Sequence, residues 1–219
     1  MKVCTDACLF GALFAEKTGD VSTILDIGSG TGLLMMMLAQ KTTAVIHGIE
    51  LNASCFEQMK ENLAQNDWKG RLTAFQGDIR TYIFAGKYDF IICNPPFFEH
   101  DLSSSTEEEN IAKHSWQLTL EDLVPVIERH LATDGSFGIL LPYHRWEYFN
   151  TICQEQHFHL REKIFISHSP AHALSRAILH FCRDKQETAS SYSISIRQPE
   201  GDKYSKEFIE LMKDYYLYL

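Results

Sequence analysis

Short apolar segments that suit β-strands alternate with segments that suit helices from residue 20 to about residue 145. Strand–helix–strand connections of this kind place consecutive strands parallel, with right-handed crossovers. The pattern therefore predicts an α/β fold with a mostly parallel sheet covered by helices. The expected strands are residues 21–27, 44–51, 72–76, 88–93 and 136–141, and the expected helices are residues 31–40, 53–65 and 118–132.

The C-terminal third has a different pattern. Residues 163–167 and 176–182 resemble two strands joined by a loop, which predicts an antiparallel hairpin at the edge of the sheet. A polar loop, a last strand at residues 192–197 and a helix from about Ser205 are expected to follow. Because the chain shows neither internal repeats nor a clear linker, residues 1–219 are expected to form one domain.

Charge and composition exclude several classes of protein. The net charge of −9 argues against a generally basic phosphate-binding surface, so a nucleic-acid partner would need a local patch. No apolar run is long enough to span a membrane, and the first residues lack the apolar core of a signal peptide. The six cysteines are scattered without a C-x-x-C pair. We therefore expect a cytoplasmic protein with reduced thiols, no metal and no membrane partner.

A glycine-rich turn follows the first expected strand. From Asp26 to Gly32 the sequence is D-I-G-S-G-T-G, and it opens a helix. Glycines such as Gly28 and Gly30 allow a tight turn and close approach of a ligand, while free amides at the helix start favour negative charge. Glu50 ends the next strand, where a carboxylate is placed to hold a ribose diol. An ordinary tight turn would carry the same glycines, but this added acid favours a nucleotide-type cofactor.

The glycine spacing is G-x-G-x-G, which resembles motif I of the class I S-adenosylmethionine-dependent methyltransferases. The resemblance implies S-adenosyl-L-methionine as the cofactor, Glu50 as the ribose acid and Asp78 as the residue that binds the adenine amine. It also implies a seven-stranded Rossmann-like sheet whose last strand is antiparallel. A nicotinamide-dependent oxidoreductase stays an alternative, although its turn normally has the spacing G-x-G-x-x-G.

The fourth expected strand ends in Asn94, Pro95, Pro96 and Phe97. This sequence resembles the [DN]-P-P-[YFW] motif of methyltransferases that act on planar amino nitrogens. The Asn94 side-chain oxygen and the Pro95 carbonyl can each accept a hydrogen bond from such an amine, and the prolines hold both acceptors rigidly. Phe97 would stack on a flipped base. A rigid turn that merely caps the strand is the structural alternative.

Both ends of the chain carry a more specific resemblance. Residues 1–12, M-K-V-C-T-D-A-C-L-F-G-A, resemble the opening signature of the tRNA1(Val) adenine-37 N6-methyltransferase family, and residues 204–217 resemble its Y-S-x-x-[FY] and [FY]-Y-L ending. The resemblance implies tRNA as the substrate, and we expect the enzyme to be a monomer. It also makes Lys2, Thr5 and Asp6 candidate cofactor contacts. A capped helix start, with Thr5 or Asp6 as N-cap, explains the same residues equally well.

Two features depart from the family pattern. Its members have a further aromatic and basic stretch before M-K-V, whereas Met1 opens the signature here, so the resemblance implies a shortened or misassigned start. Phe97 stands where adenine enzymes more commonly have Tyr. Guanine-N2 methylation of RNA and N5 methylation of a protein glutamine therefore stay open, as does a non-catalytic cofactor-sensing or RNA-binding module. Lys113, His114 and Arg161 are candidates for a local RNA patch.

Overall fold

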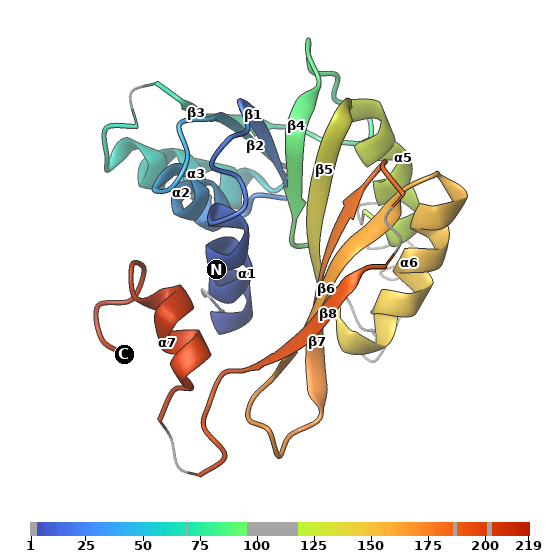
Figure 1. The fold of residues 1–219 in the computed structure, drawn as a ribbon. Coiled ribbons are helices and arrows are strands. Elements are labelled where there is room, and N and C mark those ends of the chain that lie inside the picture. Colours follow the sequence, from blue (N-terminus) through green and yellow to red (C-terminus); the bar gives the residue numbers. More distant parts are fainter. Residues whose placement is uncertain (1–3, 69, 96–117, 186–187, 201–202) are drawn as a thin grey trace, which may run out of the picture.

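The computed structural model describes residues 4–68, 70–95, 118–185, 188–200 and 203–219. Strands and helices alternate along most of this chain (Figure 1). The elements are α1 (Thr5–Ala15), β1 (Thr23–Ile27), α2 (Leu33–Ala39), β2 (Val45–Glu50), α3 (Ala53–Ala64), β3 (Leu72–Gln76), β4 (Tyr88–Cys93), α5 (Leu120–His130), β5 (Leu131–Pro142), the 3-10 turn η1 (Tyr143–Arg145), α6 (Trp146–Glu155), β6 (His159–Ser167), β7 (Leu174–Cys182), β8 (Ser190–Ser195) and α7 (Lys206–Met212).

The described strands form one sheet in the order β3-β2-β1-β4-β5-β7-β6-β8. Strands β1 to β5 are mutually parallel, and β7 runs antiparallel between β5 and β6. This confirms the predicted class: an α/β, Rossmann-like sheet, mostly parallel, with an antiparallel strand in its C-terminal part. The chain leaves β1 toward β2 and β3, and later returns beside β1 as β4, so the sheet reverses its winding between β1 and β4.

Two apolar layers enclose the sheet. On one face, buried side chains of α1, α2 and α7 pack together in a cluster that includes Phe10, Phe14 and Phe208. On the other face, α5 and α6 cover a second cluster around Phe137 and Phe149. Both clusters contain residues that are fully buried. Because burial of each such side chain contributes about 1.5–3 kcal/mol, these two layers fix the helices on the sheet.

Polar side chains define where several helices begin. The Asn52 side chain accepts a hydrogen bond from the Cys55 amide at the start of α3. Thr119 and Asp122 form a reciprocal capping box at the start of α5, and Ser205 caps α7. Each cap satisfies a backbone amide that has no partner within its helix. These local signals explain why the predicted starts of α3 and α7 agree closely with the structure.

The sheet differs from the sequence prediction at its edge. Eight strands are described, as the residue patterns predict, in place of the seven that the resemblance implies. The last one, β8, pairs in parallel with β6 and covers the hairpin formed by β6 and β7. The prediction that the hairpin forms the sheet edge is therefore wrong. The residues of β8 alternate only weakly in hydropathy and most are exposed, which suits an edge strand that buries few side chains.

The start of β5 is also different. The predicted helix at residues 118–132 and strand at residues 136–141 leave Asp134-Gly135 as the turn between them, but β5 already begins at Leu131, which is buried and pairs with Tyr88. The register then shifts, so that Phe90 pairs with Ser136. The extra residues are absorbed as an irregularity inside the strand, as in a β-bulge. Helix α6 had no counterpart among the predicted elements, and α1 was expected only as one of two explanations of Thr5 and Asp6.

Candidate active site

The carboxyl ends of β1 and β4 lie side by side, because Ile27 pairs with Cys93. The ends of β2 and β3 continue the same edge of the sheet. In open α/β sheets the crevice outside this edge, where the winding reverses, is the usual ligand site. We call it the carboxyl edge. It brings together the glycine-rich turn after β1, Glu50 at the end of β2, Asp78 after β3 and Asn94 after β4.

The turn after β1 has the backbone that its glycines predict. Gly28, Gly30 and Gly32 have φ angles of 69°, 57° and 84°, a region that residues with a side chain rarely adopt. The amides of Gly28 and Ser29 donate to the carbonyl oxygen of Ile49, at 2.9 and 3.1 Å, and so join the turn to β2. This turn leads directly into α2, whose N-cap is Gly32.

Glu50 lies against that turn. One oxygen of its carboxylate accepts a hydrogen bond from the Gly30 amide at 2.9 Å, and the other accepts one from the Asn52 amide at 2.7 Å. A carboxylate has about four acceptor positions, so two remain for hydroxyl groups. Glu50 is partly exposed, which makes those positions accessible. The arrangement fits the two neighbouring hydroxyls of a ribose.

Asp26 is the most deeply buried acid of this region. It is fully buried, and neither carboxylate oxygen has a hydrogen-bond partner within the described structure. Burial, with a smaller contribution from the nearby Glu50 carboxylate, raises the pKa of Asp26 to about 8. The Ser29 hydroxyl donates to the main-chain oxygen of Asp26 at 2.8 Å, which supports the turn rather than the carboxylate. A buried acceptor pair without partners is a site where a polar ligand group would fit.

Asp78 is held by Arg80. The guanidinium Nε lies 3.0 Å from each carboxylate oxygen, and Nη2 lies 2.7 Å from one of them. The Arg80 amide donates to the same carboxylate at 2.9 Å. These hydrogen bonds keep the pKa of Asp78 below its ordinary value. The carboxylate is thus ionised and oriented, and it keeps room for one more donor.

Asn94 follows the last residue of β4. Its side-chain oxygen is buried and has no hydrogen-bond partner within the described residues, while Pro95 is buried beside it. An amide oxygen left in this state costs free energy unless a ligand or water completes its bonding. Its place at the carboxyl edge, one strand from the glycine turn, suits an acceptor for a substrate amine. The predicted site residues Pro96 and Phe97 lie outside the described residues.

The structure gives different outcomes for the three N-terminal candidates, Lys2, Thr5 and Asp6. Lys2 lies outside the described residues. Thr5 and Asp6 form the first turn of α1, but its N-cap is Cys4 and no side chain caps the helix, so their predicted role as N-cap is wrong. Asp6 instead forms an ion pair with Arg176 of β7, with 3.3 Å between the charged atoms. This pair fastens the start of α1 to the sheet near the end of β5.

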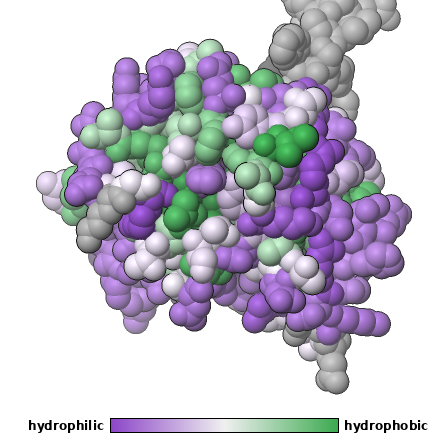
Figure 2. Space-filling view, turned by 90° about the horizontal axis from the view of Figure 1, so that it is seen from above, coloured by the Kyte–Doolittle hydropathy of each residue, from purple (hydrophilic) through white to green (hydrophobic). Residues whose placement is uncertain are grey.

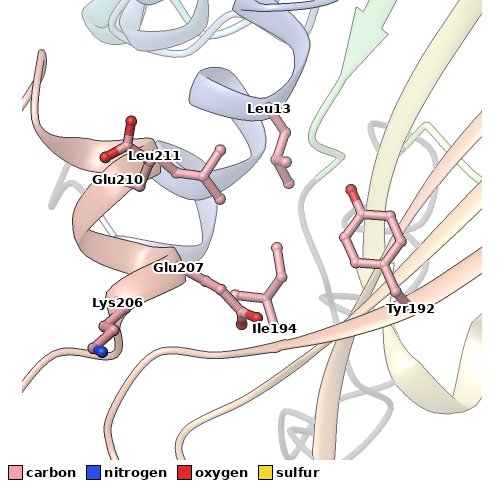
Figure 3. A pocket seen from close by; sticks show the side chains of 7 residues that line it. All are labelled: Leu13, Tyr192, Ile194, Lys206, Glu207, Glu210 and Leu211. Carbon is pink, nitrogen blue, oxygen red and sulfur yellow. The ribbon is translucent and has the colours of Figure 1, made fainter.

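Other kinds of site find little support in the described residues. Among the residues that the structure describes, no three His, Cys, Asp or Glu side chains gather as metal ligands, and no helix is both long and apolar enough to cross a membrane. A hollow of about 440 Å³ lies between α1, β8 and α7, lined by side chains such as Leu13, Ile194 and Leu211 (Figure 3). None of its lining residues belongs to the carboxyl-edge set. The face seen in Figure 2 is mostly hydrophilic, with hydrophobic side chains in its central part.

Two contributors to the site were missed in the sequence analysis. Arg80 orients Asp78, and the Asn52 amide orients Glu50. The signal for Arg80 was a basic residue two positions after the acid of an expected turn. The signal for Asn52 was a good helix N-cap directly after the second strand. Neither pattern is distinctive without the structure.

The strand order and the glycine turn define a class I methyltransferase fold. Solved structures with this fold include a predicted O-methyltransferase from Agrobacterium tumefaciens, with a TM-score of 0.71 and 16% identity over 95% of this chain and 96% of that one. Another is the glycopeptide N-methyltransferase MtfA in complex with S-adenosyl-L-methionine, with a TM-score of 0.60 and 13% identity over 84% of this chain and all of that one. These likenesses concern the fold.

The sequence comparisons are more specific. A family model described as the methyltransferase small domain matches residues 7–159. A protein of Dyadobacter fermentans named tRNA1(Val) (adenine(37)-N6)-methyltransferase is 37% identical over 99% of this chain and 91% of its own length. A protein of the same name from Photorhabdus laumondii is 34% identical over all of this chain and 89% of its own length. The chain therefore belongs to the tRNA1(Val) (adenine(37)-N6)-methyltransferase family, which confirms the resemblance seen in the sequence.

Proposed function

We propose that the protein transfers a methyl group from S-adenosyl-L-methionine to the exocyclic N6 of an adenine in tRNA, namely adenine 37 of tRNA1(Val). One observation carries the chemistry. The Asn94 side-chain oxygen is buried and without a partner among the described residues, at the end of the strand beside the glycine turn. The names and full-length similarity of the relatives support the substrate.

We assign the cofactor to the carboxyl edge between β1, β2 and β3. Glu50 has two free acceptor positions for the ribose hydroxyls, and its hydrogen bonds to the Gly30 and Asn52 amides fix its orientation. In this proposal Asp78, which is held by Arg80, accepts a hydrogen bond from the adenine amine. Asp26, Gly28 and Gly32 shape the turn against which the remainder of the cofactor lies. The bound cofactor supplies an electrophilic methyl group attached to sulfur.

The target amine is assigned to Asn94 and Pro95. Its lone pair is delocalised into the adenine ring, which makes it a weak nucleophile. The Asn94 Oδ1 and the Pro95 carbonyl oxygen each accept one N–H, so that the nitrogen becomes more tetrahedral and its lone pair faces the methyl carbon. With the cofactor bound, its methyl carbon would bond to this nitrogen while the electrons of the broken S–C bond stay on sulfur, and the extra proton on nitrogen would leave to solvent. Rigid acceptors reduce the ordering needed for this step.

The remaining assignments rest on sequence. Phe97 is proposed to stack on the flipped base, Pro96 to stiffen the motif, and Lys2, Thr5 and Asp6 to close over the cofactor. Stacking of a base on an aromatic ring contributes about 1–3 kcal/mol. Of these residues only Thr5 and Asp6 are described, and the ion pair of Asp6 with Arg176 places the start of α1 near the end of β5. A structural role for Asp6 is the competing explanation.

We also propose that residues 1–219 work as one domain and as a monomer. One sheet contains strands from both halves of the chain, and α1 and α7, from its two ends, contribute to the same apolar layer. The proposed tRNA substrate implies a place in the cytoplasm. Light scattering coupled to gel filtration tests the monomer, and a dimer that contributes residues to the site would contradict it.

Methyl transfer itself is tested with labelled cofactor. The purified protein is incubated with S-adenosyl-L-methionine carrying a radioactive methyl group, together with bulk RNA and bulk protein from a strain that lacks this methylation. Label in the tRNA fraction is expected. Label in ribosomal RNA would support guanine-N2 transfer, and label in protein would support transfer to glutamine. Cofactor binding without any transfer would identify a sensing or RNA-binding module.

A further inference from the structure

The turn after β5 presents aromatic rings and cations beside the proposed active site. Strand β5 is the neighbour of β4, and Ile139 pairs with Cys93, the residue before Asn94. Pro142 therefore ends β5 two residues beyond the level of Asn94. With about 3.3 Å per residue and 4.8 Å between strands, the turn starts on the order of 10 Å from Asn94. We call the following set the edge platform: Tyr143, Arg145, Trp146, Tyr148, Lys163 and Phe165.

The members of the edge platform form two groups: Lys163 packs with Trp146, Phe165 and Tyr143, and Arg145 packs with Tyr148. The Lys163 ammonium lies 4.4 Å from the centre of the Trp146 ring and 5.8 Å from that of Phe165. The Phe165 ring lies 5.0 Å from Tyr143, edge to face. The Arg145 guanidinium lies 5.2 Å from the centre of the Tyr148 ring. Alternating rings and cations of this kind are held in place by cation–π attraction, so the groups are ordered before any partner binds.

The aromatic rings of the edge platform are only partly buried in the apolar core. Trp146 and Phe165 contact the apolar layer under α5 and α6, yet both stay partly exposed. Tyr143 is partly exposed and belongs to neither core cluster, and 43% of Tyr148 is exposed. Large aromatic rings that remain at the surface next to a site are typical of binding surfaces rather than of packing.

The charge of the edge platform differs from that of the rest of the protein. Neither Arg145 nor Lys163 forms an ion pair with any residue that the structure describes. Three acids lie nearby: Glu147 is exposed, Glu121 accepts a hydrogen bond from the Tyr148 hydroxyl, and Glu155 is close enough to raise the pKa of Tyr148. The two cations offset most of this negative charge, in a chain with a net charge of −9. These cations keep their donors available for an anionic partner.

We propose that the edge platform binds the single-stranded tRNA nucleotides that flank the methylated base. This inference rests on the proposed function and adds the surface that the substrate uses. Unstacked bases of RNA loops bind to aromatic and guanidinium planes, while cations contact the phosphates between them. The edge platform offers both kinds of group beside Asn94. A peptide substrate would require no such pairing of rings with cations.

The test uses Lys163→Met and Arg145→Gln, which remove one cation each but keep most of the side-chain volume. We expect either change to raise the KM for tRNA about fivefold and to lower the salt dependence of log Kd by about 0.7 for each lost phosphate contact. The kcat at saturating tRNA and the Kd for S-adenosyl-L-methionine are expected to stay at wild-type values. Lys60→Met is the control, because Lys60 also lies over a ring, that of Phe56, but on α3, where it pairs with Glu57.

The outcomes separate the two proposals. If wild-type protein methylates tRNA but both platform variants keep the wild-type KM and salt dependence, the edge platform is refuted and the proposed function stands. If wild-type protein labels a protein glutamine and not RNA, both proposals are refuted. If Lys60→Met raises the KM as much as Lys163→Met does, the effect comes from general surface charge and the platform is likewise refuted.

Discussion

The backbone amide of Gly30 donates a 2.9 Å hydrogen bond to the carboxylate of Glu50. This bond joins the turn after β1 to the end of β2, so the two parts of the proposed cofactor site are fixed relative to each other. The Asn52 amide holds the second oxygen of the same carboxylate. A site arranged in this way needs little reorganisation when a ligand binds.

Replacement of this acid tests the cofactor site. In Glu50→Gln one oxygen becomes an NH2 group, which cannot accept from an amide or a hydroxyl. Loss of one or two charge-assisted hydrogen bonds is expected to weaken binding of S-adenosyl-L-methionine about 10- to 100-fold, measured by calorimetry. Glu61→Gln, on the exposed face of α3, is expected to change nothing. Unaltered affinity in Glu50→Gln would remove Glu50 from the site.

Gly48 tests the packing beneath the turn. A Cβ at this position would lie 2.2 Å from the Met35 sulfur and 2.6 Å from the Ser29 hydroxyl. Gly48→Ala is therefore expected to lower the free energy of unfolding by about 1–3 kcal/mol. Gly86→Ala is the control, because a Cβ there meets no atom within 4 Å. Urea denaturation measures both, and equal stability of the two variants would contradict the close packing of α2 on β2.

Asp26 gives the protein a specific pH dependence. Burial raises its pKa to about 8, so the folded state keeps a proton that the unfolded state releases near pH 4. The free energy of unfolding is therefore expected to fall as the pH rises from about 4 to 8, by about 1.4 kcal/mol per pH unit from this group. Asp26→Asn, which carries no ionisable group there, removes this slope. Identical slopes in urea titrations of both proteins would show that Asp26 is ionised when folded.

Arg80 is expected to act through Asp78. Arg80→Met removes the guanidinium that orients this carboxylate, so the pKa of Asp78 rises toward its ordinary value. The carboxylate stays ionised at pH 7 but loses its fixed direction. S-inosyl-homocysteine lacks the adenine amine that S-adenosyl-homocysteine carries. If Asp78 accepts a hydrogen bond from this amine, the variant loses part of its preference for S-adenosyl-homocysteine. Competition binding at pH 7 measures this ratio. A ratio equal to that of the wild type would assign the ion pair a purely structural role.

Asn94 is the residue on which the transfer step depends. Asn94→Ala is expected to lower kcat at least a hundredfold, on the order of what loss of one preorganised hydrogen bond in an active site costs. Affinity for S-adenosyl-L-methionine should stay within a few-fold of wild type. Asn94→Asp keeps the acceptor and should retain more activity than Asn94→Ala. Asn66→Ala, at an exposed position, is the control, and equal loss of binding and activity in Asn94→Ala would indicate a structural role.

The fold could be predicted well where periodic apolar residues and local turn signals agree. The ranges of β3 and β4 match the prediction, because each strand is a short apolar run between polar turns. The start of β5 could not be predicted, since Asp134-Gly135 has the composition of a turn but is held in the strand by the pairing of Leu131 with Tyr88. Helix α1 is buried along almost its whole length and thus lacks the amphipathic pattern of a surface helix.

The candidate site was predicted in its outline rather than in its contacts. Motif spacing was enough to place Glu50, Asp78 and Asn94 at one edge of the sheet, because parallel strands end on the same side. The ion pair that holds Asp78 and the one that joins Asp6 to Arg176 depend on side-chain directions, and sequence spacing does not give these. The burial of Asp26 likewise follows from the sheet around it.

The most direct test is mass spectrometry of nucleosides from tRNA1(Val) transcript incubated with the protein and S-adenosyl-L-methionine. The account predicts N6-methyladenosine, located at position 37 by fragment analysis, and a loss of this product with Asn94→Ala. N2-methylguanosine in place of N6-methyladenosine, or no methylated nucleoside from protein that binds the cofactor, would contradict it.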